Sequence, residues 1–241
     1  MKKIFVEKDC LKNNQFEVSG QEFLHLVKVL RTSEGEDIIC LLGDEFEYFC
    51  TVTHIFKKSL NAVINQKKLC QKNPKCNITL FQGAVKGEKL ELITQKCTEL
   101  GITKLVPFES NFTIAKKNLG KLDRLKKISQ EACKQCGRSI PMEICEFVGF
   151  KTLTEIIKDF DLALFLFEHA PLENTLTGIL PQIQSAKNIA IIVGAEGGFS
   201  EAENTEILKA NALPISLGER ILRAETASIC MCGFVSFIKN N

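Results

Sequence analysis

A glycine-rich turn that begins at Gly194 is the first place where this sequence could do chemistry. An apolar run ends there, Gly197 and Gly198 follow, and a single carboxylate, Glu196, lies among them. Missing side chains let a ligand approach the backbone, whose N–H groups donate hydrogen bonds. The spacing is not G-x-G-x-x-G, and the turn lacks the lysine of a phosphate-binding loop. Two interpretations stay open: a tight strand-to-helix connection, or a binding loop made of backbone.

A second turn favours the binding interpretation. The strand-like stretch ISLG ends at Leu217 and Gly218, and the next segment, predicted to be helical, carries Arg220, Arg223 and Glu225. Two successive strands that end in glycine turns are expected to form a shared cleft at the ends of adjacent central strands. The charges there either contact a ligand or form a solvated helix end.

Basic residues gather in the segment from Lys116 to Arg138. They are Lys116, Lys117, Lys121, Arg124, Lys126, Lys127, Lys134 and Arg138, and the acids among them are Asp123 and Glu131. A local cationic surface suits a phosphate backbone, although a solvated lysine-rich helix face shows the same pattern. The candidates for contact with such a phosphate backbone are Arg31, Lys116, Lys117, Arg124 and Lys127.

Alternating strands and helices must position these residues. From Asn77 onward the sequence predicts the strands NITLFQGAV, ITKLVPFES, DLALFLFE, NIAIIVGA and LPISLG. Apolar residues at three- and four-residue steps predict a helix over KGEKLELITQKCTELG. Further helices are expected over KLDRLKKISQEACKQCG, SEAENTEILKAN and ILRAETASICMCGFVSFIKN. Ser200 and Glu203 stand in capping-box positions. These units indicate a parallel α/β sheet with a ligand at the carboxyl ends of its strands.

The first part of the chain follows a different pattern. Short β-branched or aromatic stretches, namely KKIFVE, EDIICLLG, FEYFCTVTHIF and LNAVINQKK, predict strands. One helix is expected within SGQEFLHLVKVLRTSEGED, with Ser19 as its cap. The polar stretch QKNPKCN is the best candidate for a linker. We therefore expect two domains, residues 1–72 and residues 73–241.

Composition excludes several classes of protein. The 241 residues are 45% hydrophobic and 25% charged, with a net charge of +2, which is typical of a soluble globular protein. The amino terminus does not read as a signal peptide. The uncharged run over 226–238 is shorter than the roughly 20 residues of a membrane span. We expect no membrane partner.

The eleven cysteines are predicted to be reduced thiols of a cytoplasmic protein. Cys133 and Cys136 have metal-like spacing, but no second pair accompanies them, so no metal site is expected. Apolar residues of the last helix do not fit one stripe, and a helix apolar on several faces needs cover on several sides. A second subunit is one candidate cover, so a homodimer is expected.

Five ordered segments resemble the RsmE family of ribosomal RNA methyltransferases, within the SPOUT superfamily. They are HLVKVLRTSEGEDI, KGEKLELITQKCTELGITKLVPF, EACKQCGRSIP, IIVGAEGGFSEAE and LGERILRAETA. The resemblance covers nearly the whole chain. It implies an α/β domain with a trefoil knot, preceded by a small PUA-like β-barrel that helps bind RNA. Periodicity alone would predict an ordinary doubly wound sheet, so the knot comes only from the resemblance.

The resemblance also implies an activity and its residues. S-adenosyl-L-methionine would methylate N3 of a uridine in 16S ribosomal RNA, within the small ribosomal subunit. One cofactor loop would comprise Gly194, Glu196, Gly197 and Gly198, and the other Leu217, Gly218, Ile221, Leu222 and Arg223, with Leu166 ending the first strand of the pocket. Arg138 resembles an arginine that faces the active site from the partner subunit. Ala195, Cys136 and Ala224 depart from the usual proline, serine and threonine of the family.

The proposed chemistry assigns roles to three side chains. Uridine N3–H must lose a proton, so Glu196 is expected to orient the base or accept that proton. Arg138 or Arg223 would stabilise negative charge on the uracil oxygens. Glu196 could instead only hold the turn. Two other functions stay open: a non-catalytic dimeric RNA-binding module, and a ribose 2′-O-methyltransferase of the same superfamily.

Overall fold

The chain divides into two compact units. The computed structural model describes residues 1–113, 119–168, 170, 171, 174 and 176–240. The first unit comprises Met1–Asn73 together with Cys133–Pro141, and the second comprises Pro74–Ala132 with Met142–Asn241. Lys116 and Lys117, two of the predicted RNA contacts, lie outside the described residues.

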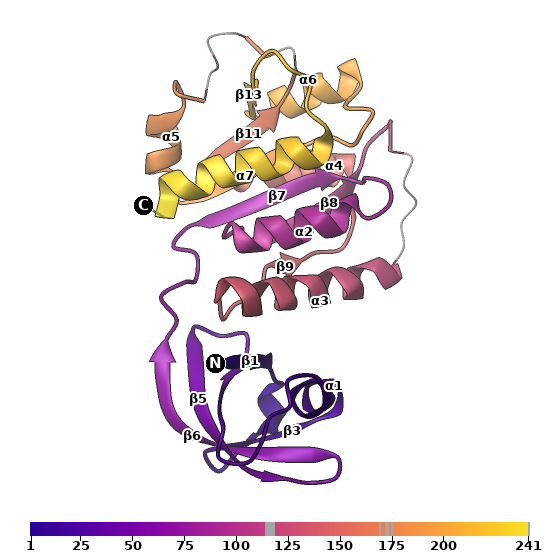
Figure 1. Ribbon diagram of the computed structural model, residues 1–241. Helices are drawn as coiled ribbons and strands as arrows, with labels where there is room; N and C mark the ends of the chain where they lie inside the picture. The colour runs from indigo at the N-terminus through magenta and orange to yellow at the C-terminus, as the bar shows by residue number, and fades with distance from the viewer. Residues whose placement is uncertain (114–118, 169, 172–173, 175, 241) are drawn as a thin grey trace. The chain divides into compact units, whose positions relative to one another are not determined.

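The first unit is built on a six-stranded sheet in the order β1-β4-β5-β6-β3-β2. Figure 1 labels β1, β3, β5 and β6 of this sheet. Its strands are β1 Lys2–Phe5, β2 Leu11–Lys12, β3 Gln15–Ser19, β4 Asp37–Leu41, β5 Phe46–Ile55 and β6 Ser59–Leu69. Only β1 and β4 pair in parallel. A core that includes Phe16, Leu26, Ile38 and Leu60 fills the unit. The four predicted strands are confirmed, and β2 and β3 were missed.

The predicted amino-terminal helix is shorter and less regular than expected. α1 runs over Gly20–Leu24 and continues as one π-helical stretch, His25–Val29. Ser19 occupies the N-cap position but its side chain makes no capping bond. Arg31 follows with φ +51°, a left-handed conformation uncommon for a residue with a side chain. The chain therefore turns sharply at this predicted RNA contact.

The second unit is an α/β fold with an all-parallel sheet, as predicted. Its strands are β7 Asn77–Gly83, β8 Lys104–Glu109, β9 Glu143–Ile144, β10 Val148–Gly149, β11 Leu162–Leu166, β12 Asn188–Val193 and β13 Leu213–Ile215. The order is β10-β8-β7-β12-β11-β13, with β9 beside β8. The threading that a trefoil knot requires stays a prediction.

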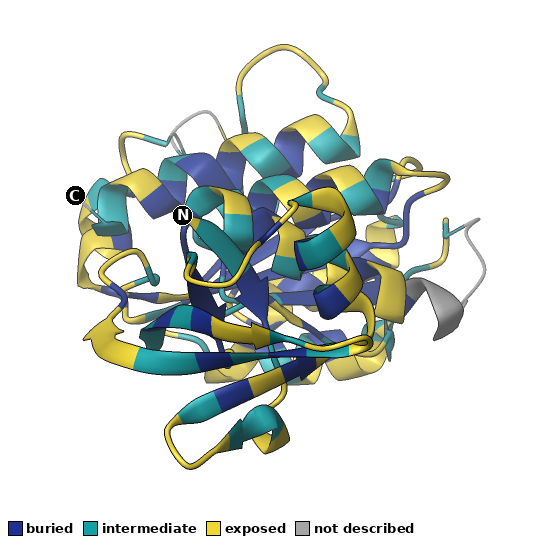
Figure 2. Cartoon of the chain, turned by 60° about the horizontal axis from the view of Figure 1, so that its bottom comes forward, coloured by how far each residue is buried: buried dark blue, intermediate teal, exposed yellow. Residues whose placement is uncertain are grey.

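Helices cover both faces of this sheet. They are α2 Lys89–Glu99, α3 Leu119–Cys136, α4 Phe150–Ile156, α5 Leu180–Ser185, α6 Glu201–Lys209 and α7 Ala224–Asn240, with a 3-10 turn over Ile157–Asp159. One core joins the sheet to α2, α3, α5 and α7, and another joins its opposite face to α4 and α6. Buried and exposed residues alternate along these helices (Figure 2). No helix within the described residues is long and apolar enough to cross a membrane.

The buried end of β7 ties three segments of the second unit together. Gln82 is fully buried, and its amide nitrogen donates to the carbonyl oxygens of Gly83 (3.0 Å) and Gly194 (3.3 Å). Its amide oxygen accepts a hydrogen bond from the hydroxyl of Ser228 on α7. A Cβ atom placed on Gly83 would lie 2.3 Å from the backbone nitrogen of Ala195. Only glycine lets β7 approach the turn this closely.

Gly83→Ala is therefore expected to destabilise the fold by about 1–3 kcal/mol, because backbone rather than a flexible side chain must move. Urea denaturation measures the change. The matched control is Gly149→Ala, where an added Cβ meets nothing within 4 Å; it should stay within about 0.5 kcal/mol of the wild type. Equal midpoints for the two variants would contradict the close contact.

Candidate functional site

Four strands of the second unit end at one edge of the sheet. Gln82 of β7 pairs with Val193 of β12, and Leu166 of β11 pairs with Ile215 of β13. Phe165 of β11 pairs with Ile192 of β12, so Leu166 and Val193 end their strands at the same height in the sheet. Since parallel strands all point one way, the segments that follow them gather at this edge, where open α/β sheets bind ligands.

The two glycine turns are not on adjacent strands, which corrects the sequence-based expectation. β11 lies between β12 and β13, and β13 is an edge strand. The expectation assumed that strands consecutive in the sequence are neighbours in the sheet, but β13 pairs with the earlier strand β11 and not with β12. Leu166, predicted to end the first strand of the pocket, is thus the strand end that separates the two turns.

The first turn is closed by its own backbone. Gly198 N–H donates to the carbonyl of Ala195 at 3.0 Å, and Gly198 has φ +64°. A Cβ atom on Gly194 would lie 2.9 Å from the ring of Phe199, and one on Gly197 would lie 2.8 Å from Cβ of Phe112. These two glycines make room for the protein's own aromatic residues. At Gly198 an added Cβ would meet only open space.

The second turn carries an open glycine and an exposed apolar side chain. Gly218 has φ +104°, and nothing lies within 4 Å of an added Cβ. Its N–H donates to the Ser216 hydroxyl at 3.2 Å. Leu217 and Leu222 pack against the core, whereas Ile221 between them is 84% exposed.

Arg220 and Arg223 lie before α7 rather than in it, contrary to the prediction. The helix begins at Ala224, and the carbonyl of Arg223 accepts from Ala227 N–H at 2.9 Å. Leu217 and Leu222 pack on the core and hold the connecting loop at both ends, so the residues between them stay outside the helix. Both arginines are exposed beside the second turn.

A lysine holds the carboxylate of the first turn. Lys89, the first residue of α2, lies 2.9 Å from Glu196 and 3.5 Å from Glu225. The backbone N–H of Lys86 also donates to Glu196, at 3.2 Å. Burial raises the pKa of Glu196, but the bonds from Lys89 and from backbone N–H groups outweigh it and hold that pKa below its usual range. Glu196 is an ionised, weakly basic carboxylate.

Arg138 belongs to the first unit, whereas both turns belong to the second. Its side chain is 3% exposed, and burial lowers the pKa of the guanidinium. The segment around it is fixed to the first unit: the Ser139 hydroxyl donates to the carbonyl of Asp44 at 2.6 Å, and Asn73 Oδ1 accepts from Ser139 N–H at 3.0 Å. The segment of Arg138 is therefore held by the first unit.

The candidates for RNA contact that the structure describes differ in whether their charge is already paired within the protein. Arg124 makes a two-pronged ion pair with Glu91, with N–O distances of 2.6 and 2.7 Å. Arg31 and Lys127 are exposed. The sequence could not show the Glu91 pair, because the two residues come from different helices.

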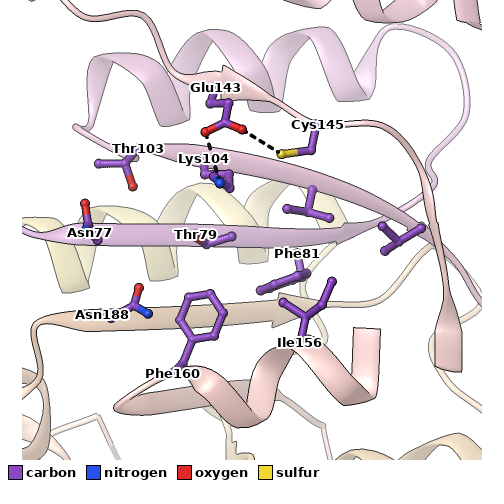
Figure 3. Close-up of a pocket in the computed structure, with 12 residues that line it drawn as sticks. Asn77, Thr79, Phe81, Thr103, Lys104, Glu143, Cys145, Ile156, Phe160 and Asn188 are labelled. Carbon is purple, nitrogen blue, oxygen red and sulfur yellow. Dashed lines mark hydrogen bonds and ion pairs between the residues drawn. The ribbon is translucent and has the colours of Figure 1, made fainter. Parts of the chain in front are cut away.

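A cavity of about 500 Å³ lies at the opposite end of the strands (Figure 3). Its lining includes Asn77, Lys104 and Asn188, the first residues of β7, β8 and β12. Lys104 pairs with Glu143 at 3.1 Å. Burial and, to a smaller extent, the negative charge of Glu143 raise the pKa of Cys145 to about 11. The thiol is thus protonated and not an activated nucleophile, and the glycine turns remain the better candidate site.

Sequence reasoning missed the residues that hold the turns in place: Gln82, Gly83, Lys89, Phe112 and Ser228. Lys89 did leave a signal. A cation at the start of a helix interacts unfavourably with the helix dipole, so an anionic partner is expected close to it. Gln82 left one as well, because an amide within an otherwise apolar strand must find hydrogen-bond partners.

Comparison with known proteins identifies relatives over nearly the whole chain. A family model described as an RNA methyltransferase domain matches residues 71–236, and one described as an RNA methyltransferase PUA domain matches residues 18–65. The chain is 29% identical to ribosomal RNA small subunit methyltransferase E of Bacillus subtilis, covering 92% of this chain and 90% of that protein. For the Rickettsia conorii protein of the same name the values are 31%, 94% and 91%.

A solved structure has the same fold. Ribosomal RNA small subunit methyltransferase E from Neisseria gonorrhoeae, bound to S-adenosyl methionine, superposes with a TM-score of 0.85 at 25% identity. The match covers 96% of this chain and 95% of that one. The similarity therefore includes both units.

Lys89→Met is expected to raise the pKa of Glu196 toward its ordinary value, because it removes the main charged donor to that carboxylate. Carboxyl NMR titration measures this directly. Because the Glu196 pKa is lowered in the folded protein, its ion pair stabilises the fold at pH values above the ordinary pKa of a glutamate. That stabilisation is lost as the pH falls through the lowered, native pKa. Because the Lys89 pKa is raised in the folded protein, the same ion pair stabilises the fold at pH values below the ordinary pKa of a lysine. That stabilisation is lost as the pH rises through the raised, native pKa. The stability gap between wild type and variant should be widest between about pH 5 and pH 10.

Lys96→Met provides the matched control, since Lys96 pairs with Glu99 on the same helix at 3.1 Å. It should leave the Glu196 titration unchanged. An unaltered Glu196 pKa in Lys89→Met would refute the assignment.

Proposed function

The chain belongs to the RNA methyltransferase family, and we propose that it transfers the methyl group of S-adenosylmethionine to N3 of a uridine in 16S ribosomal RNA. The small-subunit methyltransferases it resembles support the substrate, and the cofactor in the Neisseria structure supports the methyl donor. The observation that carries the proposal is the alignment of two side-chain-poor turns with the end of β11 at one sheet edge. Such a reaction takes place in the cytoplasm.

The residues of this edge suit a flat nucleotide cofactor. Gly198 and Gly218 leave open space where other residues would carry Cβ. We assign cofactor contact to the first turn, at Gly194, Glu196, Gly197 and Gly198, and to the second, at Leu217, Gly218, Ile221 and Leu222, with Leu166 between them. The cofactor supplies an electrophilic methyl group on a sulfonium. The chain supplies backbone donors and shape, and positioning accounts for much of the rate.

The protonation state of Glu196 bears on its role. Uridine N3 must release a proton when it gains the methyl group, and an efficient acceptor has a pKa near the working pH. Lys89 and the backbone hold the Glu196 pKa below its usual range, which makes it a weak base. We infer that Glu196 shapes the turn and orients polar groups, and that the proton leaves by another route.

Two arginines are candidates for stabilising negative charge on the uracil oxygens. Arg223 is exposed in the same unit as the turns, beside the second turn. Arg138 resembles an arginine that faces the active site from the partner subunit, and we propose that it acts on the site of a second subunit in a homodimer. Apolar exposure on neighbouring helices supports a dimer: Phe237 on α7 is 64% exposed, and Leu92 on α2 is also exposed.

We further propose a division of labour along the chain. Residues 1–72 bind RNA, as the PUA family model suggests, and residues 73–241 carry methyl transfer. The exposed Arg31 and Lys127 are assigned to phosphate contact, together with Arg124, Lys116 and Lys117. Such cationic contacts give affinity that falls as salt rises.

Small ribosomal subunits that lack the modification should accept labelled methyl from S-adenosylmethionine, and nucleotide mapping should place the label on N3 of one uridine. Subunits that already carry the modification are the matched control and should take up none. Label on a ribose 2′-oxygen would contradict base methylation. Absence of both label and S-adenosylhomocysteine binding would favour a non-catalytic RNA-binding module.

Arg138→Ala should lower turnover by at least ~100-fold while leaving S-adenosylhomocysteine affinity nearly unchanged, as expected for a group that stabilises developing charge. Gly218→Val, strained at φ +104°, should lose the cofactor instead. In a mixed dimer of the two variants, one site keeps an intact turn and receives Arg138 from its partner.

Restored activity in the mixed dimer is therefore the expected result, with each pure variant as its control. Arg138→Lys, which keeps the charge but not the planar donor geometry, guards against a folding defect in Arg138→Ala. No recovery in the mixed dimer, or a sample that gel filtration shows to be monomeric, would exclude the shared site.

A further inference from the structure

An aromatic side chain stands exposed against the first glycine turn. Phe112, in the loop after β8, is 48% exposed. A Cβ atom on Gly197 would lie 2.8 Å from Cβ of Phe112 and 3.4 Å from its carbonyl oxygen, so the two backbones touch. Gly197 directly follows Glu196. The Phe112 side chain therefore starts one residue away from the carboxylate of the candidate site.

Hydrogen bonds fix the loop that carries this ring. Ser110 N–H donates to the Thr113 hydroxyl at 2.8 Å, and Thr113 N–H donates to the Ser110 carbonyl at 3.0 Å. Asn111 N–H donates to Glu203 Oε1 at 2.7 Å, and the Asn111 side chain donates to the Ser200 hydroxyl at 3.1 Å. The loop is thus closed on itself and bound to the start of α6.

Glu203 is a buried anchor for this arrangement. It is 4% exposed, and its Oε2 accepts from both the N–H and the hydroxyl of Ser200 at 2.9 Å, completing the predicted capping box. The same helix start also holds the first turn, because Phe199 lies between Gly194 and Ser200. One buried carboxylate therefore links the loop of Phe112 to the turn, and the backbone from which the ring projects is held by the fold.

We propose that the ring of Phe112 is a stacking platform for a nucleobase of the substrate RNA as that strand enters the site. This proposal rests on the proposed function. Single exposed apolar residues are common and need no explanation on their own. Here the loop that carries the ring is anchored beside the turn, and proteins read unpaired RNA by stacking bases on aromatic side chains. A base must leave its own stack before its ring nitrogen can be methylated, and an aromatic surface compensates that loss.

The test compares Phe112→Leu with the wild type, because leucine keeps an apolar side chain at this position and removes the aromatic face. Stacking of one base contributes roughly 1–3 kcal/mol, so Kd and KM for unmodified small ribosomal subunits should rise about 5- to 140-fold. S-adenosylhomocysteine affinity by calorimetry should stay unchanged. Phe112→Tyr should behave as the wild type. Leu208→Ala, at another exposed apolar residue of the second unit, is the control and should change neither constant.

Each result decides between defined alternatives. Unchanged Kd and KM in Phe112→Leu, with an active wild type, overturn the stacking role and leave the methyltransferase proposal intact. If Phe112→Leu binds small ribosomal subunits more weakly and the wild type is inactive, the result supports stacking and contradicts the proposed activity. Loss of S-adenosylhomocysteine affinity would assign the ring to the cofactor instead. A dimer that dissociates in Phe112→Leu would show that a second copy covers it; either of these last two outcomes overturns the proposal.

Discussion

The buried amide of Gln82 joins the three segments that form the candidate site. Its nitrogen binds the carbonyls of Gly83 and Gly194, and its oxygen accepts from Ser228 on the last helix. A buried amide must satisfy its donors and acceptor or lose roughly 1–3 kcal/mol for each group left unpaired. Gly83 adds a steric condition, since any side chain there would strike Ala195. The position of the first turn thus depends on one polar side chain and one missing side chain.

Charge around the turn follows from the same arrangement. The start of α2 places Lys89 within reach of Glu196 and of Glu225 in the first turn of α7. A helix start disfavours a lysine and favours a glutamate, so this pairing offsets the cost of the cation and holds two helix starts together. The outcome is an ionised carboxylate with its proton affinity reduced. Such a group suits orientation and polarity better than proton removal.

The sequence predicted the elements of this site better than their arrangement. Apolar strands and the capping box of α6 follow local rules, and both occur as expected. Sheet order is a non-local property, and the insertion of β11 between β12 and β13 left no local signal. The last helix was predicted to include Ile221–Arg223, but it begins at Ala224, and the loop before it packs on the core through Leu217 and Leu222, a contact that arises only in the fold. The glycines were recognised, but Gly194 and Gly197 accommodate Phe199 and Phe112, whose contacts arise only in the fold.

One large apolar side chain is exposed to solvent beside the first turn, Phe112, and one in the second, Ile221, and the two side chains differ in what they can bind. Ile221 is flanked by the anchors Leu217 and Leu222, so its position is restrained although it is 84% exposed. An aliphatic side chain offers contact area without a π face, which suits the edge of a flat ligand or an apolar patch of a second subunit. Phe112 offers an aromatic face on a hydrogen-bonded loop. Aliphatic contact is tolerant of shape, whereas stacking requires a planar partner. The ring of Phe112 is therefore suited to a nucleobase, and Ile221 to the edge of the cofactor or to a neighbouring chain.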